Sequence, residues 1–276
     1  MQGIEQFSLT EKVAVVMGGG GVLGGAIADG FGAAGAQVAV TDVAQDRIDA
    51  CVDRIRKAGG SAKGYTVDVF DRSSIIACCD KIHADLGRVD ILVNCVGGNM
   101  AGATTSAEQP FWDLPAEAIE KVMNLNFLAG TVMPSQVFGA RMKDNPEGAS
   151  IINISSMNAL RPLTRIPGYS AAKAAVSNFT QWLAVHLAQE YSPKLRVNAI
   201  APGFFLTTQN RFLLIDEKTG EPTPRGETII AHTPMGRYGN PEDLIGVALW
   251  LASDASRFVT GIVVPIDGGF SAFSGV

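Results

Sequence analysis

The residues that most clearly suggest chemistry are a tyrosine and a lysine four positions apart. Tyr169 and Lys173 bound the stretch YSAAK near the start of a predicted helix, and this spacing puts both side chains on one helical face, about one turn apart. A phenol has an ordinary pKa of about 10, and a neighbouring ammonium group favours its ionised form. We therefore predict that Lys173 lowers the pKa of Tyr169 and makes it a usable acid or base near neutral pH. A solvated helix face can carry the same pair, so the surrounding sequence decides.

Two hydroxyl groups lie where this pair would need them. A predicted buried strand, residues 150–154, contains three isoleucines and is followed by Ser155 and Ser156. Ligands in open α/β sheets bind beyond the carboxyl ends of the strands. Ser156 precedes Tyr169 by 13 residues, and we expect both at the same end of the sheet.

A glycine-rich turn suggests a binding function. Residues 18–25 read GGGGVLGG between a predicted strand and a predicted helix, and Gly19, Gly21 and Gly24 satisfy the pattern G-x-G-x-x-G. A pyrophosphate needs close approach to backbone N–H groups and to a helix N-terminus, which side chains would obstruct. Asp42 follows the next strand, where a carboxylate can bind both ribose hydroxyls of NAD and repel the 2′-phosphate of NADP. The alternative is a turn that only packs a helix on a strand, with Asp42 as a helix N-cap.

Composition excludes several classes of protein. The chain has 276 residues, 18% of them charged, and a net charge of −5, which argues against a basic nucleic-acid-binding protein. Hydrophobic residues make up 47% of the chain, enough for a core and too many for global disorder. Cys51, Cys78, Cys79 and Cys95 have neither a disulfide framework nor metal-ligand spacing. We therefore expect reduced thiols in a cytoplasmic protein, with no metal. No apolar run is long enough to cross a membrane, and no signal peptide is indicated.

Short apolar runs alternate with longer helical patterns along the chain. Strands are predicted at 12–17, 37–41, 62–67, 89–94, 150–154, 195–200 and 262–266, and helices at 22–34, 45–58, 71–86, 115–143, 168–191 and 241–252. This rhythm predicts an α/β fold, a Rossmann-like doubly wound sheet of seven parallel strands with helices on both faces. We expect one domain over 1–276. The polar, proline-containing stretch at 208–239 lacks periodicity and predicts a substrate lid at about 204–239.

Further motifs follow in a fixed order. They are the turn Met17 to Gly24, Asp68-Val69, Asn94 to Gly97, Asn126 within NLN, Ser156, Tyr169 and Lys173, Pro202-Gly203 with Thr207, and Asp267 to Gly269. With these motifs the chain resembles a short-chain dehydrogenase/reductase of the compact, single-domain kind, from about Leu9 to Phe270. It is also similar to the branch that contains D-mannonate oxidoreductases and gluconate 5-dehydrogenases.

The resemblance implies a catalytic tetrad of Asn126, Ser156, Tyr169 and Lys173, with NAD(H) as the cofactor. In oxidation, Tyr169 would take the hydroxyl proton while hydride passes to the nicotinamide, and Ser156 would hold the substrate oxygen. Lys173 would also bind the nicotinamide ribose, and Asn126 would order a water relay to Lys173. The residues implied to bind the cofactor are Gly18, Gly21, Val22, Leu23, Gly24, Asp42, Asp68, Val69, Asn94, Val96, Gly97, Tyr169, Lys173, Pro202, Gly203, Phe205 and Thr207.

The chain departs from the family pattern at four positions. Met17 replaces the usual Thr or Ser, whose hydroxyl ties down the glycine turn, and Val22 replaces a glycine. Cys95 and Val96 replace Asn and Ala after the fourth strand. These changes bear on the cofactor geometry and leave the tetrad complete.

The expected substrate border collects arginines and amides. Arginine can hold a carboxylate with two hydrogen bonds, and amides suit sugar hydroxyls, so a sugar acid is favoured. The side chains expected to contact it are Asn99, Asn158, Arg161, Asn210 and Arg211, and Arg165, Gln209, Arg225 and His232 lie in the same segments.

Two alternatives remain open for the function. The phenylalanines and leucines at 204–214 would suit a hydrophobic alcohol or ketone. A non-catalytic dinucleotide-binding scaffold or sensor could use the same fold, although the complete tetrad argues against it. The helices at 115–143 and 168–191 are rich in small and apolar residues, and the resemblance suggests that they pair in a homodimer or homotetramer.

Overall fold

Seven parallel strands form one sheet in the computed structural model, which describes residues 3–207 and 210–275. Their order is β3-β2-β1-β4-β5-β6-β7. The strands are β1 (Val13–Met17), β2 (Gln37–Asp42), β3 (Ser61–Thr66), β4 (Ile91–Asn94), β5 (Ala149–Ile154), β6 (Leu195–Pro202) and β7 (Val263–Ile266). The predicted Rossmann-like sheet is confirmed, with strand ends displaced by at most two residues. From β1 the chain adds β2 and β3 on one side of the sheet, and it then places β4 on the other side of β1. The topological switch point therefore lies between β1 and β4, where a ligand crevice opens at the carboxyl ends of the strands.

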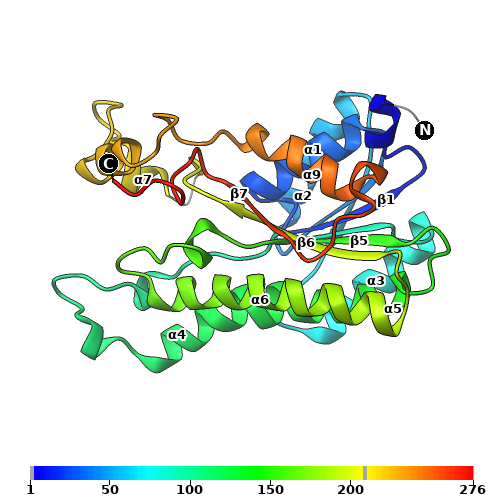
Figure 1. Ribbon diagram of the computed structural model, residues 1–276, viewed down its shortest axis with the longest axis horizontal. Helices are drawn as coiled ribbons and strands as arrows, with labels where there is room; N and C mark the ends of the chain where they lie inside the picture. The colour runs from blue at the N-terminus through cyan, green and yellow to red at the C-terminus, as the bar shows by residue number, and fades with distance from the viewer. Residues whose placement is uncertain (1–2, 208–209, 276) are drawn as a thin grey trace.

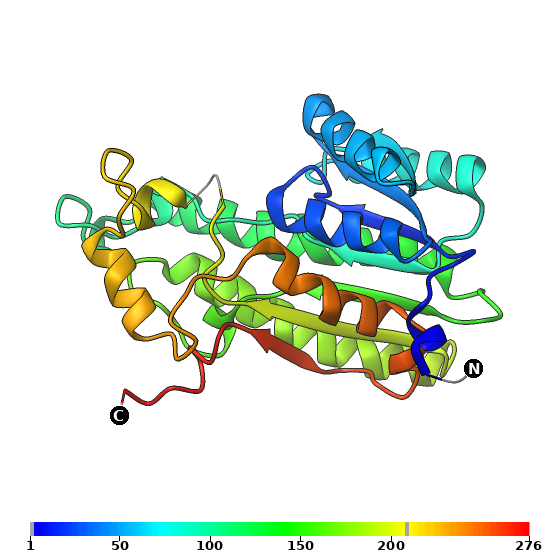
Figure 2. The ribbon, with the colours of Figure 1, turned by 90° about the horizontal axis from the view of Figure 1, so that it is seen from above.

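Helices cover both faces of the sheet (Figures 1 and 2). On the upper face in Figure 1 lie α1 (Val22–Ala33), α2 (Gln45–Lys57) and α9 (Ile245–Ala252). On the lower face lie α3 (Arg72–Leu86), α5 (Met133–Met142) and α6 (Pro167–Glu190). Side chains of β1 alternate between the two layers, since Val16 packs above the sheet and Val15 below it. The central strand β1 is apolar and buried throughout because both of its faces are covered.

The helical region predicted at 115–143 is not one α-helix. It consists of α4 (Ala116–Met123), a π-helical segment (Asn124–Val132) and α5. A side chain at Gly130 would collide with the backbone oxygens of Leu125 and Val96, so glycine lets the wide turn lie against the loop after β4. The Thr131 hydroxyl donates to the main-chain oxygen of Asn126 at 2.9 Å. π-Helical turns are rare and are found frequently at functional sites.

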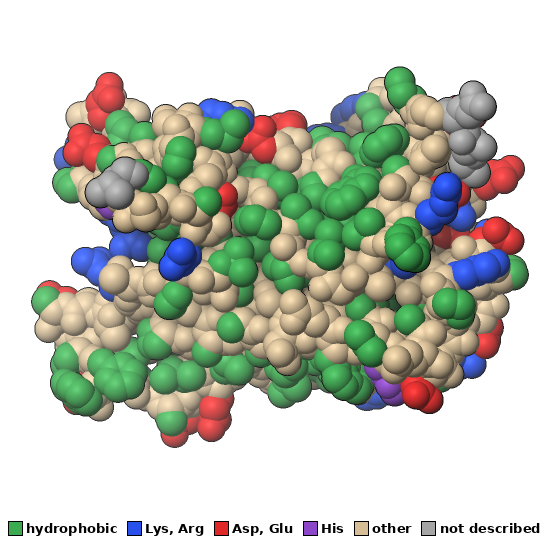
Figure 3. All heavy atoms as spheres, in the orientation of Figure 1, with side chains coloured by type: hydrophobic (Ala, Val, Ile, Leu, Met, Phe, Trp, Pro, Cys, Tyr) green, Lys and Arg blue, Asp and Glu red, His purple; other side chains and the backbone are tan. Residues whose placement is uncertain are grey.

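The lid segment, residues 204–239, is more ordered than its sequence indicates. It contains two short helices, α7 (Arg211–Leu214) and α8 (Pro224–Ala231), where the sequence predicted irregular chain. The Thr223 side chain caps α8 by accepting a hydrogen bond from the Gly226 N–H at 3.1 Å. Leu214, Ile229 and Tyr238 form a small apolar cluster of their own. In Figure 3 a hollow separates the lid, at the left, from the elements below it.

Candidate active site

The glycine turn between β1 and α1 is fixed by the neighbouring strand. The Gly19 N–H donates to the Thr41 carbonyl at 2.8 Å, and the Thr41 hydroxyl donates to the Val16 carbonyl at 3.2 Å. Thr41 of β2 therefore ties down the turn that lacks a hydroxyl at Met17. Gly18 has φ +76°, a conformation that favours glycine. A Cβ at Gly24 would collide with the Gly18 carbonyl oxygen, so α1 can begin at Val22 directly against the turn.

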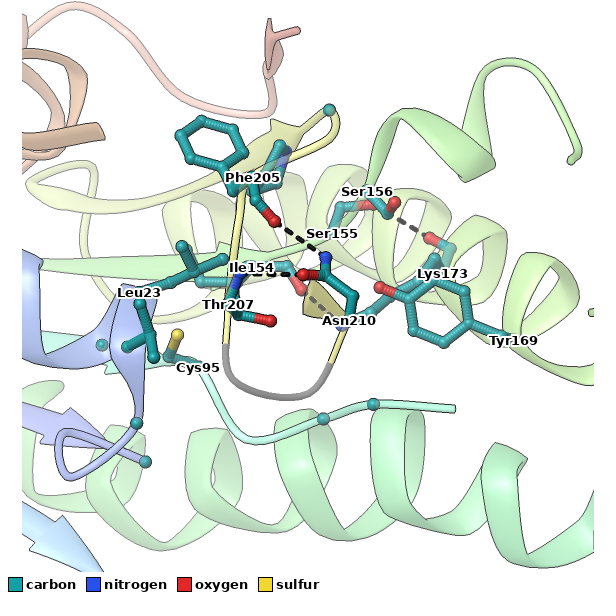
Figure 4. Close-up of a pocket in the computed structure, with 18 of the residues that line it drawn as sticks. Leu23, Cys95, Ile154, Ser155, Ser156, Tyr169, Lys173, Phe205, Thr207 and Asn210 are labelled. Atoms are coloured by element: carbon teal, nitrogen blue, oxygen red, sulfur yellow. Dashed lines mark hydrogen bonds between the residues drawn. The ribbon is translucent and has the colours of Figure 1, made fainter. Parts of the chain in front are cut away.

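Two cavities join at this turn, across the carboxyl ends of the strands. The first, of about 280 Å³, contains the expected tyrosine, lysine and serine (Figure 4). Predicted cofactor and catalytic residues that line it are Gly18, Gly21, Val22, Leu23, Gly24, Gly97, Ser156, Tyr169, Lys173, Pro202, Gly203, Phe205 and Thr207. The second, of about 380 Å³, is lined by Asp42, Asp68, Val69, Val96 and, again, Gly18, Gly21 and Gly97. The side chain of Val22 is 37% exposed, so it borders the first cavity without filling the turn.

Asn94 is the predicted cofactor residue that lies outside both cavities. Only 1% of it is exposed, and its amide donates to Ser135 Oγ at 2.9 Å and to Asn153 Oδ1 at 2.8 Å. The side chain thus points into the layer beneath the site, where it joins β4, β5 and α5. The expectation of direct cofactor contact by Asn94 is not supported by this geometry.

Asp42 shares its end of the site with Arg47, which sequence reasoning missed. The Asp42 carboxylate accepts a hydrogen bond from the Ala44 N–H at 3.1 Å and lies 3.9 Å from the Arg47 guanidinium. Ala44, not Asp42, is the N-cap residue of α2. Arg47 lines both cavities, and a Cβ at Gly20 would meet both Arg47 Cβ and Asp42 Oδ2 within 3 Å. The signal available in the sequence was the place of Arg47 in the first turn of the helix that follows Asp42.

The tyrosine and lysine lie on the first turns of α6. The Lys173 ammonium donates to the Ile154 carbonyl at 2.8 Å and lies 5.7 Å from the centre of the Tyr169 ring. The Ser155 hydroxyl donates to the Lys173 carbonyl at 3.1 Å, so the end of β5 holds this part of α6. In Figure 4 the Tyr169 side chain points from α6 into the cavity. Ser156 borders the same cavity and accepts a hydrogen bond from the Asn158 N–H at 3.2 Å.

The pKa values in the site differ from the expected pattern. Burial raises the pKa of Tyr169, and hydrogen bonding with Ser156 acts in the opposite direction. Burial also lowers the pKa of Lys173 to about 8, because taking an ammonium group out of water penalises its charged form. The expected lowering of the Tyr169 pKa by Lys173 is therefore not what the protein alone shows. Tyr169 is protonated at neutral pH and suited to donate a proton.

Asn126 lies beside Lys173, with Gly97 between them. A Cβ at Gly97 would meet Asn126 Oδ1 at 2.5 Å and Lys173 Nζ at 3.1 Å. The Asn126 amide donates to the Gly98 and Val122 carbonyls at 2.8 Å each, and its oxygen accepts from the Gly98 N–H at 3.0 Å. The carboxamide thus holds the loop after β4, and the expected water relay from Asn126 to Lys173 stays a prediction.

Of the five residues expected to contact substrate, the cavity includes only Asn210. The Asn99 amide donates to Thr104 Oγ1 at 2.7 Å on the surface, and Asn158 Oδ1 accepts the Leu163 N–H at 3.0 Å. The Arg161 side chain donates to the Ser271 carbonyl at 3.1 Å, and Arg211 is exposed on α7.

Asn210 itself bonds to the lid backbone. Its carboxamide accepts from the Thr207 N–H and donates to the Phe205 carbonyl, both at 2.8 Å (Figure 4). The nearby Gln209 lies outside the described residues. In the described part of the chain, no three His, Cys, Asp or Glu side chains gather as metal ligands. No helix over residues 3–207 and 210–275 has both the length and the apolar character to span a bilayer.

Comparison with known proteins identifies the family. A family model described as enoyl-(acyl carrier protein) reductase, within the short-chain dehydrogenases/reductases, matches residues 21–271. The chain belongs to the short-chain dehydrogenase/reductase family. This short-chain dehydrogenase/reductase is an oxidoreductase of a family that acts on alcohols with a pyridine nucleotide. The turn and loop that contain Gly18, Gly20, Gly24 and Gly97 fit such a cofactor, because side chains at these positions would collide with their surroundings or fill the space.

Relatives of this short-chain dehydrogenase/reductase match nearly its whole length. An uncharacterised oxidoreductase, UxuB, of Bacillus subtilis is 46% identical over 98% of both chains. A Haemophilus influenzae protein provisionally assigned as a D-mannonate oxidoreductase, crystallised with NAD, is 44% identical over 98% of both chains, with a TM-score of 0.90. A gluconate 5-dehydrogenase from Burkholderia cenocepacia, crystallised with NADP and tartrate, is 29% identical over 98% of both chains, with a TM-score of 0.85.

Proposed function

We propose that this enzyme transfers hydride between NAD(H) and a secondary alcohol or ketone of a sugar acid. The observation that carries the proposal is one cavity that holds Ser156, Tyr169 and Lys173 together with the glycine turn. The names of the relatives, a D-mannonate oxidoreductase and a gluconate 5-dehydrogenase, support a sugar acid as the substrate class.

The tetrad residues have separate tasks in the proposed reaction. The bound nicotinamide supplies or accepts the hydride. Tyr169 donates its hydroxyl proton to the carbonyl oxygen in reduction, and Ser156 donates a hydrogen bond to the same oxygen. In oxidation, the positive charge of the oxidised nicotinamide would favour the phenolate of Tyr169, which takes the alcohol proton. Lys173 binds the ribose next to the nicotinamide and passes protons to solvent. Asn126 positions the loop at Gly98 and so holds the cavity wall beside Lys173.

The proposed NAD preference depends on Asp42. Its carboxylate is only 9% exposed and lines the second cavity, where it can accept hydrogen bonds from ribose hydroxyls and repel a 2′-phosphate. Arg47 partly offsets this repulsion from 3.9 Å away. We expect wild-type kcat/KM to favour NAD, and Asp42→Ser to shift the ratio toward NADP by at least about tenfold. Arg47→Gln in that background should reverse the shift. A wild-type preference for NADP would contradict this assignment.

A substrate panel tests the substrate class. Formation of NADH is measured with D-gluconate, D-mannonate and a series of apolar secondary alcohols at saturating NAD. We expect turnover of at least one sugar acid with a kcat/KM well above that for each apolar alcohol. The reverse order would favour the hydrophobic-substrate alternative, in which Phe204 and Phe205 face the substrate. Binding of NAD with no turnover in either direction would favour a non-catalytic sensor.

We further propose a homodimer or homotetramer in the cytoplasm. An aromatic row along α6 supports the oligomer: Phe179, Trp182, His186 and Tyr191 follow one another at 4.8–6.0 Å between ring centres. Trp182 is 56% exposed and Tyr191 55%, so a second subunit would bury a continuous apolar surface. Light scattering of wild type and Trp182→Glu would measure the mass, and a monomeric wild type would contradict the proposal.

A further inference from the structure

Two arginines, one in the loop before α6 and one in the lid, have no acidic partner among the residues that the structure describes. Arg165 lies in the loop between β5 and α6, four residues before Tyr169, and Arg225 lies in the first turn of α8 in the lid. Four other arginines, by contrast, lie within 3 Å of an aspartate: Arg54, Arg88, Arg141 and Arg237. Within residues 3–207 and 210–275, neither Arg165 nor Arg225 is part of an ion pair. Figure 3 shows Lys and Arg side chains gathered in the hollow beneath the lid.

The positive charge of Arg165 acts on Arg225. Partial burial, and then the positive charge of Arg165, lower the pKa of Arg225. Like charges held together repel, and the fold supplies no carboxylate to offset this repulsion among the residues described. An anion placed between the two groups would remove the repulsion and gain charge-assisted hydrogen bonds from both.

The backbone holds Arg165 in a fixed place. Its φ is +75°, which is uncommon for any residue with a side chain. The Arg165 carbonyl accepts the Thr105 N–H at 2.8 Å, so the loop after β4 fixes this conformation. Strained residues that their surroundings hold in place cluster at ligand sites. Arg161, in the same loop, instead bonds to the C-terminal Ser271.

We propose that Arg165 and Arg225 together bind the carboxylate of the substrate, at the far end from the carbon that reacts beside Tyr169. This inference rests on the proposed sugar-acid function and adds the residues that would select the anion. Guanidinium groups suit the task because each can bond a carboxylate with two N–H groups. Arg165 comes from the loop before α6 and Arg225 from α8 of the lid, so the proposed clamp joins these two segments.

Variants of the two arginines test the clamp. Arg165→Gly removes the side chain and keeps a residue that accepts a positive φ, and Arg225→Met removes the second charge at similar length. Lys218→Met is the matched control, because it removes one positive charge from an exposed position elsewhere in the lid. We expect each arginine variant to raise KM for D-gluconate or D-mannonate by about 10- to 100-fold. In the control variant, KM for the sugar acid should stay within about twofold of wild type. The Kd for NAD should also stay within about twofold of wild type in all three variants.

A second measurement separates failure of the clamp from failure of the proposed function. Tartrate binding to the NAD-saturated protein is measured by calorimetry, at low and at high salt. If sugar acids are turned over and both arginine variants leave KM within threefold, the clamp is overturned. If no sugar acid is turned over, a tenfold loss of tartrate affinity in both variants still supports the clamp. Unchanged or undetectable tartrate binding in that case overturns it.

Discussion

Beneath the site, near the carboxyl ends of β4 and β5, buried polar side chains hydrogen-bond to one another. In the lid, by contrast, polar side chains bond mainly to the main chain of the lid itself. The layer beneath the site, which we call the floor, comprises Asn94, Ser135, Asn153 and Thr180. All four are at most 5% exposed. Asn153 donates to Thr180 at 2.9 Å and accepts from Asn94 at 2.8 Å. The floor thus joins two strands and two helices through buried bonds that exclude water.

The lid has much less to stabilise it. Its apolar cluster contains only Leu214, Ile229 and Tyr238 as buried members, and the Tyr238 hydroxyl is buried without a hydrogen-bond partner among the described residues. Asn210 ties the entry of the lid to Thr207 and Phe205. Segments with few buried contacts open at low free energy, and substrate-binding elements are commonly drawn from them. From this comparison we expect substitutions in the floor to affect stability, and substitutions in the lid to affect substrate binding.

The largest effect should come from Tyr169, the group proposed to transfer the proton. Tyr169→Phe removes the hydroxyl and keeps the ring, so we expect kcat to fall by about 10²- to 10⁴-fold in both directions. Stopped-flow NADH fluorescence measures the rate, and titration should show a Kd for NAD within about twofold of wild type. A kcat within tenfold of wild type would contradict the proposed role of Tyr169 in proton transfer.

Removing one hydrogen-bonding side chain from the floor should lower the stability of the fold. Asn153→Ala leaves the Asn94 amide and the Thr180 hydroxyl each without one buried partner, and we expect a loss of about 2–4 kcal/mol in the free energy of unfolding. Urea denaturation measures this loss. Asn99→Ala, which removes a surface bond to Thr104, is the control and should cost less than about 1 kcal/mol. Equal losses of unfolding free energy in the two variants would show that the buried bonds of the floor stabilise the fold no more than a surface bond does.

Lys173 of α6 carries a buried charge, whose cost depends on pH. The pKa of Lys173 is lowered from 10.5 to about 8, so between these values the unfolded chain binds more protons than the folded one. Stability from this group therefore rises with pH across that window and is lowest below pH 8, by up to about 3 kcal/mol. Compared with Lys173→Met, wild type should gain this amount from pH 7.5 to 10.5 in denaturation experiments. A pH-independent difference between the two proteins would contradict the burial of a charged Lys173.

The lid should respond in kinetics rather than in stability. Asn210→Ala breaks the bonds to Thr207 and Phe205, and we expect KM for substrate to rise about three- to tenfold, as for one or two net hydrogen bonds. The midpoint of thermal unfolding should stay within about 2 °C because the main core is not touched. Asn210→Asp, which keeps the acceptor for the Thr207 N–H, should recover part of the loss. A large drop in the unfolding midpoint would place the lid and the floor in one cooperative unit.

The sequence predicted the sheet and the tyrosine–lysine pair because both depend on local patterns. Seven apolar runs, each bounded by turns, leave few alternatives to a parallel sheet, and the i, i+4 spacing of Tyr169 and Lys173 is independent of tertiary detail. Features that depend on packing were missed or misassigned. Asn94 is buried under the site because Ser135 of α5 lies there to receive it, and Arg47 approaches Asp42 only after α2 has packed.

The pKa of Tyr169 shows the same limit. Sequence spacing brought a cation near the phenol, but burial raises the phenol's pKa and lowers that of the lysine itself. How far each group is withdrawn from water depends on the whole fold. The two short helices of the lid, likewise, form on a small cluster whose members Leu214 and Ile229 are not adjacent in the chain.

The π-helical segment makes the register of Asn126 depend on chain length. Such a segment holds an extra residue relative to an α-helix that joins the same two ends. Deleting one residue between positions 127 and 131 would allow ordinary α-helical bonding to resume, and at about 100° per residue it would turn Asn126 away from Gly98 relative to α5. Every side chain of the tetrad would still be encoded, yet one of them would face the wrong way. An insertion or deletion of a single codon here would thus matter more than most substitutions.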